Sequence, residues 1–181
     1  LAALQVPFCK ADPVGSTKIN VMGSIHMLEL ARQRGISQFS YASSVAAPAM
    51  GENDWLATLY GAHKVCGEQM ARVYWQDWGV PSVGIRPAII YGPGRDQGMS
   101  AAPTIALLAA EVGAEYTIPF TGDVGFVHVE DAATRFIAAA SRSYTGAHVF
   151  DLNGTPATVT EMLAELATHY PEAAITASGE A

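Results

Sequence analysis

Apolar residues recur at helical spacing in the first half of the chain. From about Ser16 to Arg34 they return every three residues, which predicts a helix with one face on a core: Ile19, Met22, Ile25, Leu28 and Ala31. Ser16 suits the N-cap, and Gly35 marks the end. A second helix is predicted from about Thr58 to Trp78, where Gly79-Val80-Pro81 ends it.

Short apolar runs that separate the helices predict strands at 38–42 and 82–86. Residues 1–15, punctuated by Pro7, Pro13 and Gly15, predict the end of a buried strand followed by a loop. A loop of about fifteen residues precedes the second helix and has the length of a functional loop. The alternation of helix and strand is typical of a doubly wound parallel sheet, in which ligands collect at the strand ends.

After Tyr91 the chain is rich in glycine, proline and short elements. Helices are predicted near 100–112 and from Glu130 to about Arg142, and Thr160 is expected to cap a last helix that reaches His169. Strands are predicted at 116–119, 126–129 and 148–152. We therefore expect a small mixed α/β lobe in the second half.

Bulk properties narrow the class of protein. Half of the 181 residues are hydrophobic and 15% are charged, as in a globular chain, and the net charge of −7 argues against nucleic acid or an anionic membrane as partner. Cys9 and Cys66 match no metal or disulfide spacing, so we expect no metal site and a reduced, cytoplasmic compartment. The apolar start at Leu1 leads us to expect a longer natural chain whose N-terminal part precedes it.

Tyr60 and Lys64 carry the strongest chemical signal. Four residues apart on a helix, they share one face, where an ammonium can lower the pKa of a phenol. Ser43-Ser44 at a strand end could offer a hydroxyl to the same substrate oxygen. His63 points off that face, and we interpret it as a packing or solvent residue.

Six segments together resemble the extended short-chain dehydrogenases/reductases, the group that holds the NAD-dependent epimerases and dehydratases. In chain order they are Leu1-Ala2-Ala3, Asn20-Val21-Met22-Gly23, Phe39 to Ser44, Tyr60-Gly61-Ala62-His63-Lys64, Arg86 to Gly94, and Phe126 to Asp131. The resemblance implies a Rossmann-like doubly wound sheet without its N-terminal strands. Residues 1–90 would form the C-terminal part of the dinucleotide-binding domain, and residues 91–181 a substrate-binding lobe.

The resemblance also implies a role for each matching residue. Tyr60 would be the general acid/base, Lys64 would lower its pKa and bind the nicotinamide ribose, and Ser44 would hold the substrate oxygen. Arg95 and His128 are candidate substrate contacts, and Arg86 is either an anion contact or a structural residue. The cofactor would be NAD or NADP, with NAD favoured, in a cleft lined by Leu1, Ala2, Ala3, Asn20, Ser43, Tyr60, Lys64, Ile85 and Pro87.

Departures from the family pattern limit what the resemblance implies. The glycine-rich turn that seats the pyrophosphate is absent, so we expect this chain alone to bind the cofactor poorly. Val45-Ala46 replaces the Asp-Glu that follows the hydroxyl residue in dehydratases, which argues against dehydration. Val124 stands where many nucleotide-sugar enzymes have an arginine, which argues against a nucleotide-sugar substrate.

Two functions remain open from the sequence. The first is an NAD(P)-dependent oxidoreductase or epimerase that acts on a hydroxyl of a sugar or sugar-derived small molecule. The alternative is a non-catalytic sensor or scaffold that binds a dinucleotide. In either case the resemblance implies a homodimer formed through the helix that carries Tyr60.

Overall fold

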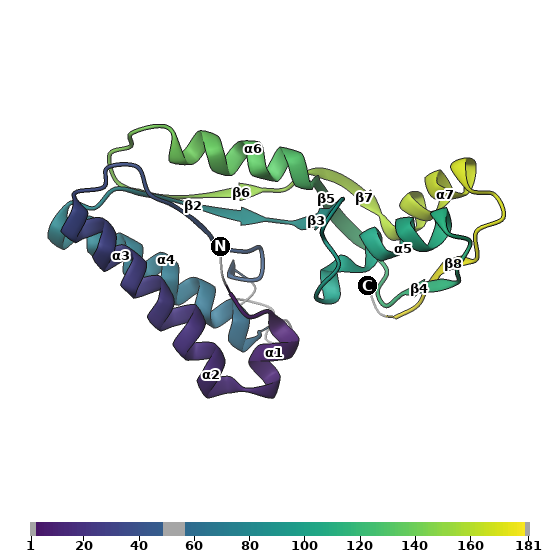
Figure 1. Cartoon of the computed structure of the whole chain (residues 1–181), viewed down its shortest axis with the longest axis horizontal. Helices are drawn as coiled ribbons and strands as arrows, with labels where there is room; N and C mark the ends of the chain where they lie inside the picture. The colour runs from purple at the N-terminus through teal and green to yellow at the C-terminus, as the bar shows by residue number, and fades with distance from the viewer. Residues whose placement is uncertain (1–2, 49–56, 180–181) are drawn as a thin grey trace. The chain divides into compact units, whose positions relative to one another are not determined.

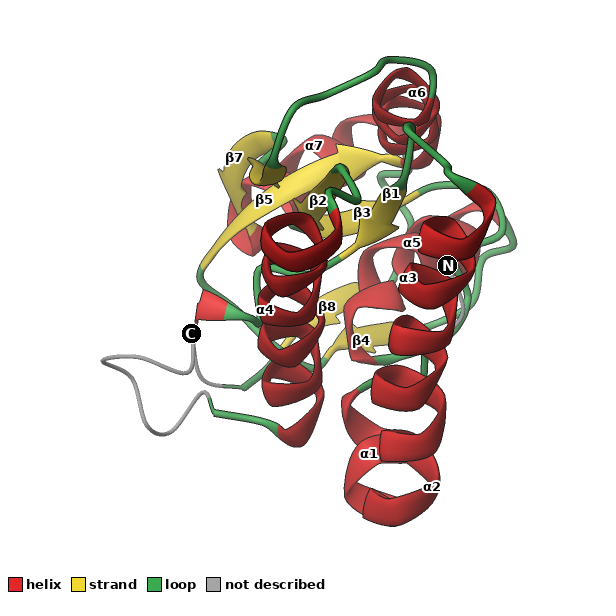
Figure 2. Ribbon diagram, turned by 90° about the vertical axis from the view of Figure 1, so that its left-hand side faces the viewer, coloured by secondary structure: helices red, strands yellow, loops and turns green. Residues whose placement is uncertain are grey.

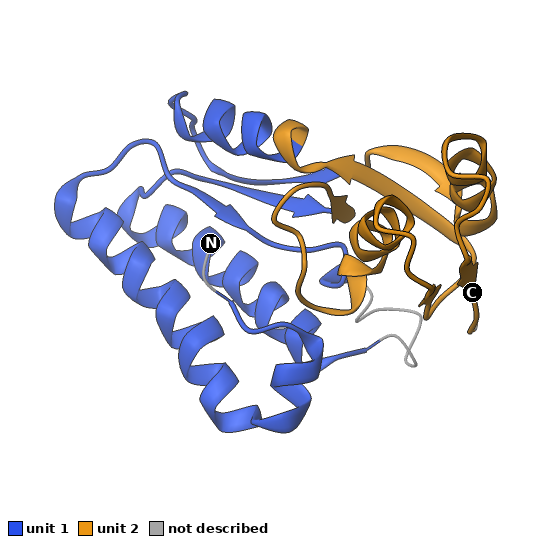
Figure 3. Cartoon of the chain, turned by 45° about the vertical axis from the view of Figure 1, so that its right-hand side comes forward, with its two compact units in different colours: residues 1–87, 132–152 blue, residues 88–131, 153–181 orange. Residues whose placement is uncertain are grey.

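The computed structural model describes residues 3–48 and 57–179. The chain forms two compact units, which Figure 3 shows in different colours. Unit 1 consists of Leu1–Pro87 and Ala132–Leu152, and unit 2 of Ala88–Asp131 and Asn153–Ala181. The expected loop before the second helix lies largely outside the described residues.

Unit 1 is built on a parallel sheet of three strands. They are β1 (Ser40–Ala42), β2 (Ser82–Pro87) and β6 (Ala147–Leu152), in the order β1-β2-β6. The register pairs Tyr41 with Gly84, and Gly84 with Val149. The parallel α/β architecture predicted from the sequence is confirmed. The stretch Ala132–Leu152, which we expected in the second lobe, belongs to unit 1 because β6 completes this sheet.

Helices cover both faces of the sheet. On one face α3 (Gly23–Arg34) and α4 (Leu59–Trp78) lie side by side (Figures 1 and 2) and close a core of Leu28, Ala31, Ala71, Tyr74 and Val80. On the other face the unit 1 part of α6 (Val129–Ala140) packs on β2, with Ala139 against Val83 and Ile85. Burial on both faces explains why β2 reads as a short apolar run.

Capping residues fix the ends of the two long helices. Thr58 Oγ1 accepts a hydrogen bond from Gly61 N at 3.0 Å and caps α4, and Gly79, at φ 67°, ends it. Gly35, at φ 60°, ends α3. These are the positive φ values that glycine adopts without strain, so both predicted helix ends are confirmed.

The N-terminal segment differs from its prediction. Residues we expected in a loop form α1 (Val6–Ala11) and α2 (Pro13–Thr17), and a π-helical turn η1 (Lys18–Met22) then leads into α3. Both prolines lie in the first turn of a helix, where a missing N–H costs nothing, and the Asp12 side chain accepts from Gly15 N. Pro7 and Pro13 therefore mark the starts of two helices and not a loop.

The described part of unit 2 contains two small sheets, three helical segments and the first residues of α6. The strands β3 (Ile89–Tyr91), β5 (Asp123–His128) and β7 (Thr155–Thr158) form one sheet, and β4 (Tyr116–Ile118) pairs with β8 (Ile175–Ala177). The helical segments are η4 (Met99–Ala101), α5 (Ala102–Glu111) and α7 (Val159–His169). Ala102, Ala106, Ile118 and Val159 form the buried core.

The start of α7 corrects one sequence prediction. Thr158, and not Thr160, caps the helix: its hydroxyl accepts from Glu161 N at 3.0 Å, and the Glu161 carboxylate accepts from Thr158 N at 2.7 Å. This reciprocal capping box requires a glutamate three residues after the cap, which Thr158 has and Thr160 lacks. Across the described parts of both units, no helix is long and apolar enough to cross a membrane.

Candidate active site

Tyr60 and Lys64 lie in the first two turns of α4, on one face of the helix. The Lys64 ammonium is 5.3 Å from the centroid of the Tyr60 ring, and its Nζ donates to the carbonyl oxygen of Ala42 at 2.7 Å. Ala42 is the last residue of β1, so this bond ties the lysine to the end of a strand. Burial lowers the pKa of Lys64 from its ordinary value.

A glycine brings the start of α4 close to the segment that follows β1. A Cβ at Gly61 would lie 2.5 Å from the carbonyl oxygen of Ala46, a distance that real Cβ atoms do not adopt. Only glycine permits this approach of helix to backbone. It holds the Tyr60 turn beside the short segment that contains Ser44.

The two serines have different environments. The Ser44 hydroxyl is partly exposed and accepts a hydrogen bond from Ala46 N at 3.1 Å. Since that bond uses a lone pair, the Ser44 hydroxyl proton remains available to donate. The Ser43 hydroxyl is buried and donates to the Glu68 carboxylate. Its predicted place in the cofactor cleft stays a prediction.

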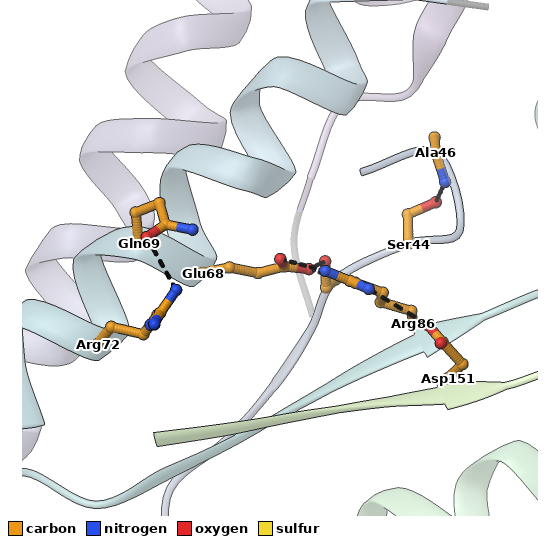
Figure 4. Close-up of polar contacts among 8 residues, drawn as sticks. Ser44, Ala46, Glu68, Gln69, Arg72, Arg86 and Asp151 are labelled. Carbon is orange, nitrogen blue, oxygen red and sulfur yellow. Dashed lines mark hydrogen bonds and ion pairs between the residues drawn. The ribbon is translucent and has the colours of Figure 1, made fainter. Parts of the chain in front are cut away.

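Glu68, which the sequence analysis missed, lies on the same face of α4 as Tyr60 and Lys64, one turn further along. Its carboxylate accepts from Arg86 Nε and Nη2, each at 2.7 Å, and Arg86 Nη1 is 3.5 Å from Asp151 Oδ1 (Figure 4). Burial opposes the charge of Glu68, but hydrogen bonds from Arg86 and Ser43 outweigh it and lower the pKa of Glu68. The network joins α4 to β2, β6 and the end of β1, and of the two sequence interpretations of Arg86 it matches the structural one.

Asn20 fastens the N-terminal segment to the helical layer. Its Oδ1 accepts from Leu4 N at 2.8 Å, and its Nδ2 donates to the Leu4 carbonyl at 2.9 Å. The amide is 5% exposed, so it acts here as a bridge between η1 and the backbone of Leu4. Whether it also lines a cofactor cleft stays a prediction.

His63 is the second residue whose role the sequence did not reveal. His63 is buried, at 6% exposure. Its Nδ1 is 3.2 Å from Asn20 Nδ2 in η1, and its Nε2 is 3.0 Å from Thr17 Oγ1 at the end of α2. The only signal in the sequence was its helical position, 100° from Lys64 around the helix axis. The helical position of His63 predicts the direction of its side chain, but it does not identify the residues that the ring contacts.

A cavity of about 740 Å³ in unit 1 is bordered by three of the predicted cofactor residues, Ala3, Asn20 and Lys64. The small residues Ala42 and Gly67 also line it. The cavity runs along the edge strand β1, since residues 39–42 line it. Apolar side chains of α3 and α6, such as Met27 and Phe136, line another part of the same cavity.

The remaining predicted residues divide between the units. Ile85 is buried in the core beneath α6, and its carbonyl accepts from Ser43 N at 2.7 Å; the Pro87 carbonyl accepts from Val45 N at 3.4 Å. Leu1 and Ala2 lie outside the described residues. Their predicted contacts with cofactor stay predictions.

Arg95 and His128, the predicted substrate contacts, lie in unit 2. Arg95 Nη2 donates to Ser100 Oγ at 2.7 Å, and its buried Nε has no hydrogen-bond partner among the described residues. His128 packs edge-on against Tyr91, with ring centroids 5.4 Å apart, and its Nδ1 accepts from Glu130 N at 3.4 Å. The structure therefore gives His128 a packing role in unit 2, and the substrate role of both residues stays a prediction.

Comparison with known proteins finds a curated relative and solved structures of similar fold. UDP-glucose 4-epimerase of Mycolicibacterium smegmatis is 27% identical over 151 residues, which are 76% of this chain and 48% of that protein. UDP-N-acetylglucosamine 4-epimerase from Methanobrevibacter ruminantium superposes with a TM-score of 0.86 at 21% identity, over 100% of this chain and 63% of that one. A GalE-like L-threonine dehydrogenase from Cupriavidus necator gives 0.86 at 22% identity, over 99% and 63%.

The structural likeness at this identity shows the fold, which is the Rossmann-like fold predicted from the sequence. The chain spans about half the length of the curated relative and 63% of these solved structures. A family model described as the NAD dependent epimerase/dehydratase family matches residues 1–153, most of the chain. The matched segment contains the Tyr60 helix, the Ser43-Ser44 strand end and the Asn20 bridge, and the chain belongs to the NAD-dependent epimerase/dehydratase family.

Proposed function

We propose that the protein containing this chain is an NAD(P)-dependent epimerase or dehydrogenase, with NAD favoured, that acts on a hydroxyl of a sugar or sugar-derived substrate. One observation carries the proposal: a half-buried ammonium, Lys64, is fixed to the end of β1 at 2.7 Å and lies over the ring of Tyr60 on the same helix face. The pair is the arrangement that moves a proton to or from a substrate oxygen. Its place within the matched family segment supports the same reading.

The residues around the cavity fit one end of a dinucleotide. Lys64 offers N–H donors suited to ribose hydroxyls, and Ala3 and Ala42 beside it leave room for a ring. The chain has no glycine-rich turn for a pyrophosphate, so the fit is limited to the nicotinamide ribose. When bound, the dinucleotide supplies the hydride acceptor at the substrate carbon.

The side chains of the site divide the proton chemistry between them. The phenolate oxygen of Tyr60 accepts the proton of the substrate hydroxyl and becomes the neutral phenol, and the positive charge of Lys64 stabilises the phenolate before the transfer. Ser44, whose Oγ already accepts from Ala46 N, donates its own proton to the same substrate oxygen. The bond from Lys64 to Ala42 keeps the ammonium at the strand end during the reaction.

The test is Tyr60→Phe in the full-length protein. We expect turnover to fall by about 10²- to 10⁴-fold, because the variant has no group to accept the proton, while NAD binding stays within about twofold. Tyr144→Phe is the matched control, because it removes the hydroxyl of a tyrosine whose ring packs against the core beneath α6. This variant should keep wild-type turnover. Unchanged turnover in Tyr60→Phe would refute the assignment.

The same preparation decides between the proposal and its alternative, the non-catalytic sensor or scaffold. NAD binding without hydride exchange across a panel of sugars and other alcohols would favour the sensor. If turnover is found, accumulation of reduced NAD identifies a dehydrogenase, and inversion of the substrate without such accumulation identifies an epimerase.

We also propose that the protein forms a homodimer through α4. Two large apolar side chains on this helix, Val73 and Trp78, are 47% and 52% exposed. Exposed large apolar side chains on a helix are typical of a protein interface.

A further inference from the structure

Three side chains form a continuous hydrogen-bonded row that connects α4 to the backbone of the N-terminal segment. The row begins at Thr17, passes through His63 and Asn20, and ends at the backbone of Leu4. His63 directly precedes Lys64, and Leu4 directly follows Ala3. Lys64 and Ala3 both line the cavity described above. The row therefore links two parts of the cavity wall that are far apart in sequence.

The orientation of the Asn20 amide follows from its two bonds to Leu4. Its oxygen must face the Leu4 N–H, and its nitrogen must face the Leu4 carbonyl. The other N–H of the amide has two acceptors within reach, His63 Nδ1 at 3.2 Å and the weaker acceptor Cys9 Sγ at 3.5 Å. Since an amide nitrogen only donates, His63 Nδ1 must accept.

The acceptor role of Nδ1 determines the form of the imidazole. A neutral ring that accepts at Nδ1 carries its proton on Nε2, which donates to Thr17 Oγ1 at 3.0 Å. Thr17 in turn donates to the Pro13 carbonyl at 2.7 Å, so each bond in the row has one donor and one acceptor. Burial, with a smaller contribution from the charge of Lys64, lowers the pKa of His63 and favours this neutral form.

We infer that His63 is a positioning residue: through Nδ1 it holds the Asn20 amide, and through that amide the Leu4 segment, in register with the helix that carries Tyr60 and Lys64. The inference deepens the proposed function and rests on it where it concerns the dinucleotide. Without the Nδ1 acceptor, a buried N–H of Asn20 keeps only a weak acceptor, Cys9 Sγ at 3.5 Å, and the amide is held less firmly against Leu4. The wall formed by Ala3 then loses its fixed place relative to Lys64.

The experiment compares three variants of the full-length protein. His63→Leu removes the acceptor and keeps most of the volume, whereas His63→Asn places an amide oxygen near the position of Nδ1. Thr17→Val is the matched control, because it removes the other partner of the imidazole and leaves the bonds to Leu4 untouched. If His63→Leu does not fold, His63→Gln, whose longer chain displaces the acceptor, replaces it.

Two readouts are measured: hydrogen exchange of the Leu4 amide and the dissociation constant of NAD. We expect both to rise about tenfold in His63→Leu, with kcat at saturating NAD within about twofold, and to stay near wild type in His63→Asn and Thr17→Val. Unchanged Leu4 exchange in His63→Leu would overturn the inference. Equal damage in His63→Asn and His63→Leu would overturn it too, because packing alone would then explain the effect.

The readouts separate this inference from the proposed function. A wild-type protein that binds no dinucleotide would refute the proposed function, while the exchange of the Leu4 amide would still decide whether His63 positions the segment. Conversely, loss of turnover in Tyr60→Phe together with unchanged Leu4 exchange in His63→Leu would keep the function and remove the role of His63.

Discussion

Replacing Glu68 by glutamine tests the network that holds the active-site helix on the sheet. The Glu68 carboxylate is 4% exposed and accepts two bonds of 2.7 Å from Arg86 as well as the bond from Ser43. Glutamine has the same shape, but it presents an NH₂ group to one of the two guanidinium donors and removes the negative charge.

The magnitude follows from the burial of the two partners. Removing one member of a buried ion pair costs about 3–5 kcal/mol, because the other charge stays uncompensated. The Arg86 side chain keeps 23% of its surface exposed, so water can solvate part of it, and we expect the lower end, about 3 kcal/mol. For a chain of this length that corresponds to a fall in Tm of about 6–12 °C.

The effect should depend on pH. Because the folded state lowers the pKa of Glu68, its contribution to stability is present above the ordinary carboxyl value of 4.5 and is lost as pH falls through the folded value. The difference in unfolding free energy between wild type and Glu68→Gln should therefore be full at pH 7 and shrink below about pH 4.

Urea denaturation at several pH values measures this difference, and an unchanged m-value shows that the unfolding reaction is the same. Glu29→Gln is the matched control: Glu29 pairs with Arg32 at 2.7 Å, but on an exposed surface where screening leaves little net stabilisation. A loss in Glu68→Gln no larger than that in Glu29→Gln would refute the reasoning from burial.

Three further predictions concern α4. Gly61→Ala should destabilise the protein by about 1–3 kcal/mol in urea denaturation, because the new Cβ meets the Ala46 carbonyl. Gly67→Ala on the same helix should stabilise the protein by up to about 1 kcal/mol, because the space around its new Cβ is open. Equal effects of the two substitutions would contradict the close approach of Gly61 to Ala46. Thr58→Ala removes the N-cap and should cost about 1 kcal/mol, measured by the same method, and Thr58→Ser should restore it. Val73→Glu should shift the full-length protein from dimer to monomer in light scattering, and a dimer that persists would exclude this helix face as the interface.

Local signals in the sequence were sufficient for the two long helices of unit 1, α3 and α4. The apolar spacing in α3 and the glycines at both helix ends act within a few residues, so periodicity and capping identified them. The short strands β3, β7 and β8 were missed. Their place is set by pairing with β5 and β4, which are distant in sequence.

The candidate site shows the same limit. The spacing of Tyr60 and Lys64 could be read from the helix period alone. The sequence did not show that Lys64 bonds to Ala42 or that Ser43 donates to Glu68. Both contacts depend on where β1 ends relative to α4. A buried glutamate and a buried histidine look in sequence like any exposed helical residues, because their partners, Arg86 and Asn20, lie on other elements.

One face of α4 carries Tyr60, Lys64 and Glu68 at successive turns, and each residue lies beside a different part of unit 1. Glu68 holds the helix on the sheet through Arg86, Lys64 bonds to the end of β1, and Tyr60 lies at the helix start, beside the segment that contains Ser44. A helix is rigid over two turns, so the anchor at Glu68 fixes the position of Lys64 about one turn away. Loss of the anchor should therefore lower the turnover of Glu68→Gln even at temperatures where the variant remains folded. Full turnover in a destabilised Glu68→Gln would show that the bond between Lys64 and Ala42 is sufficient to position the site.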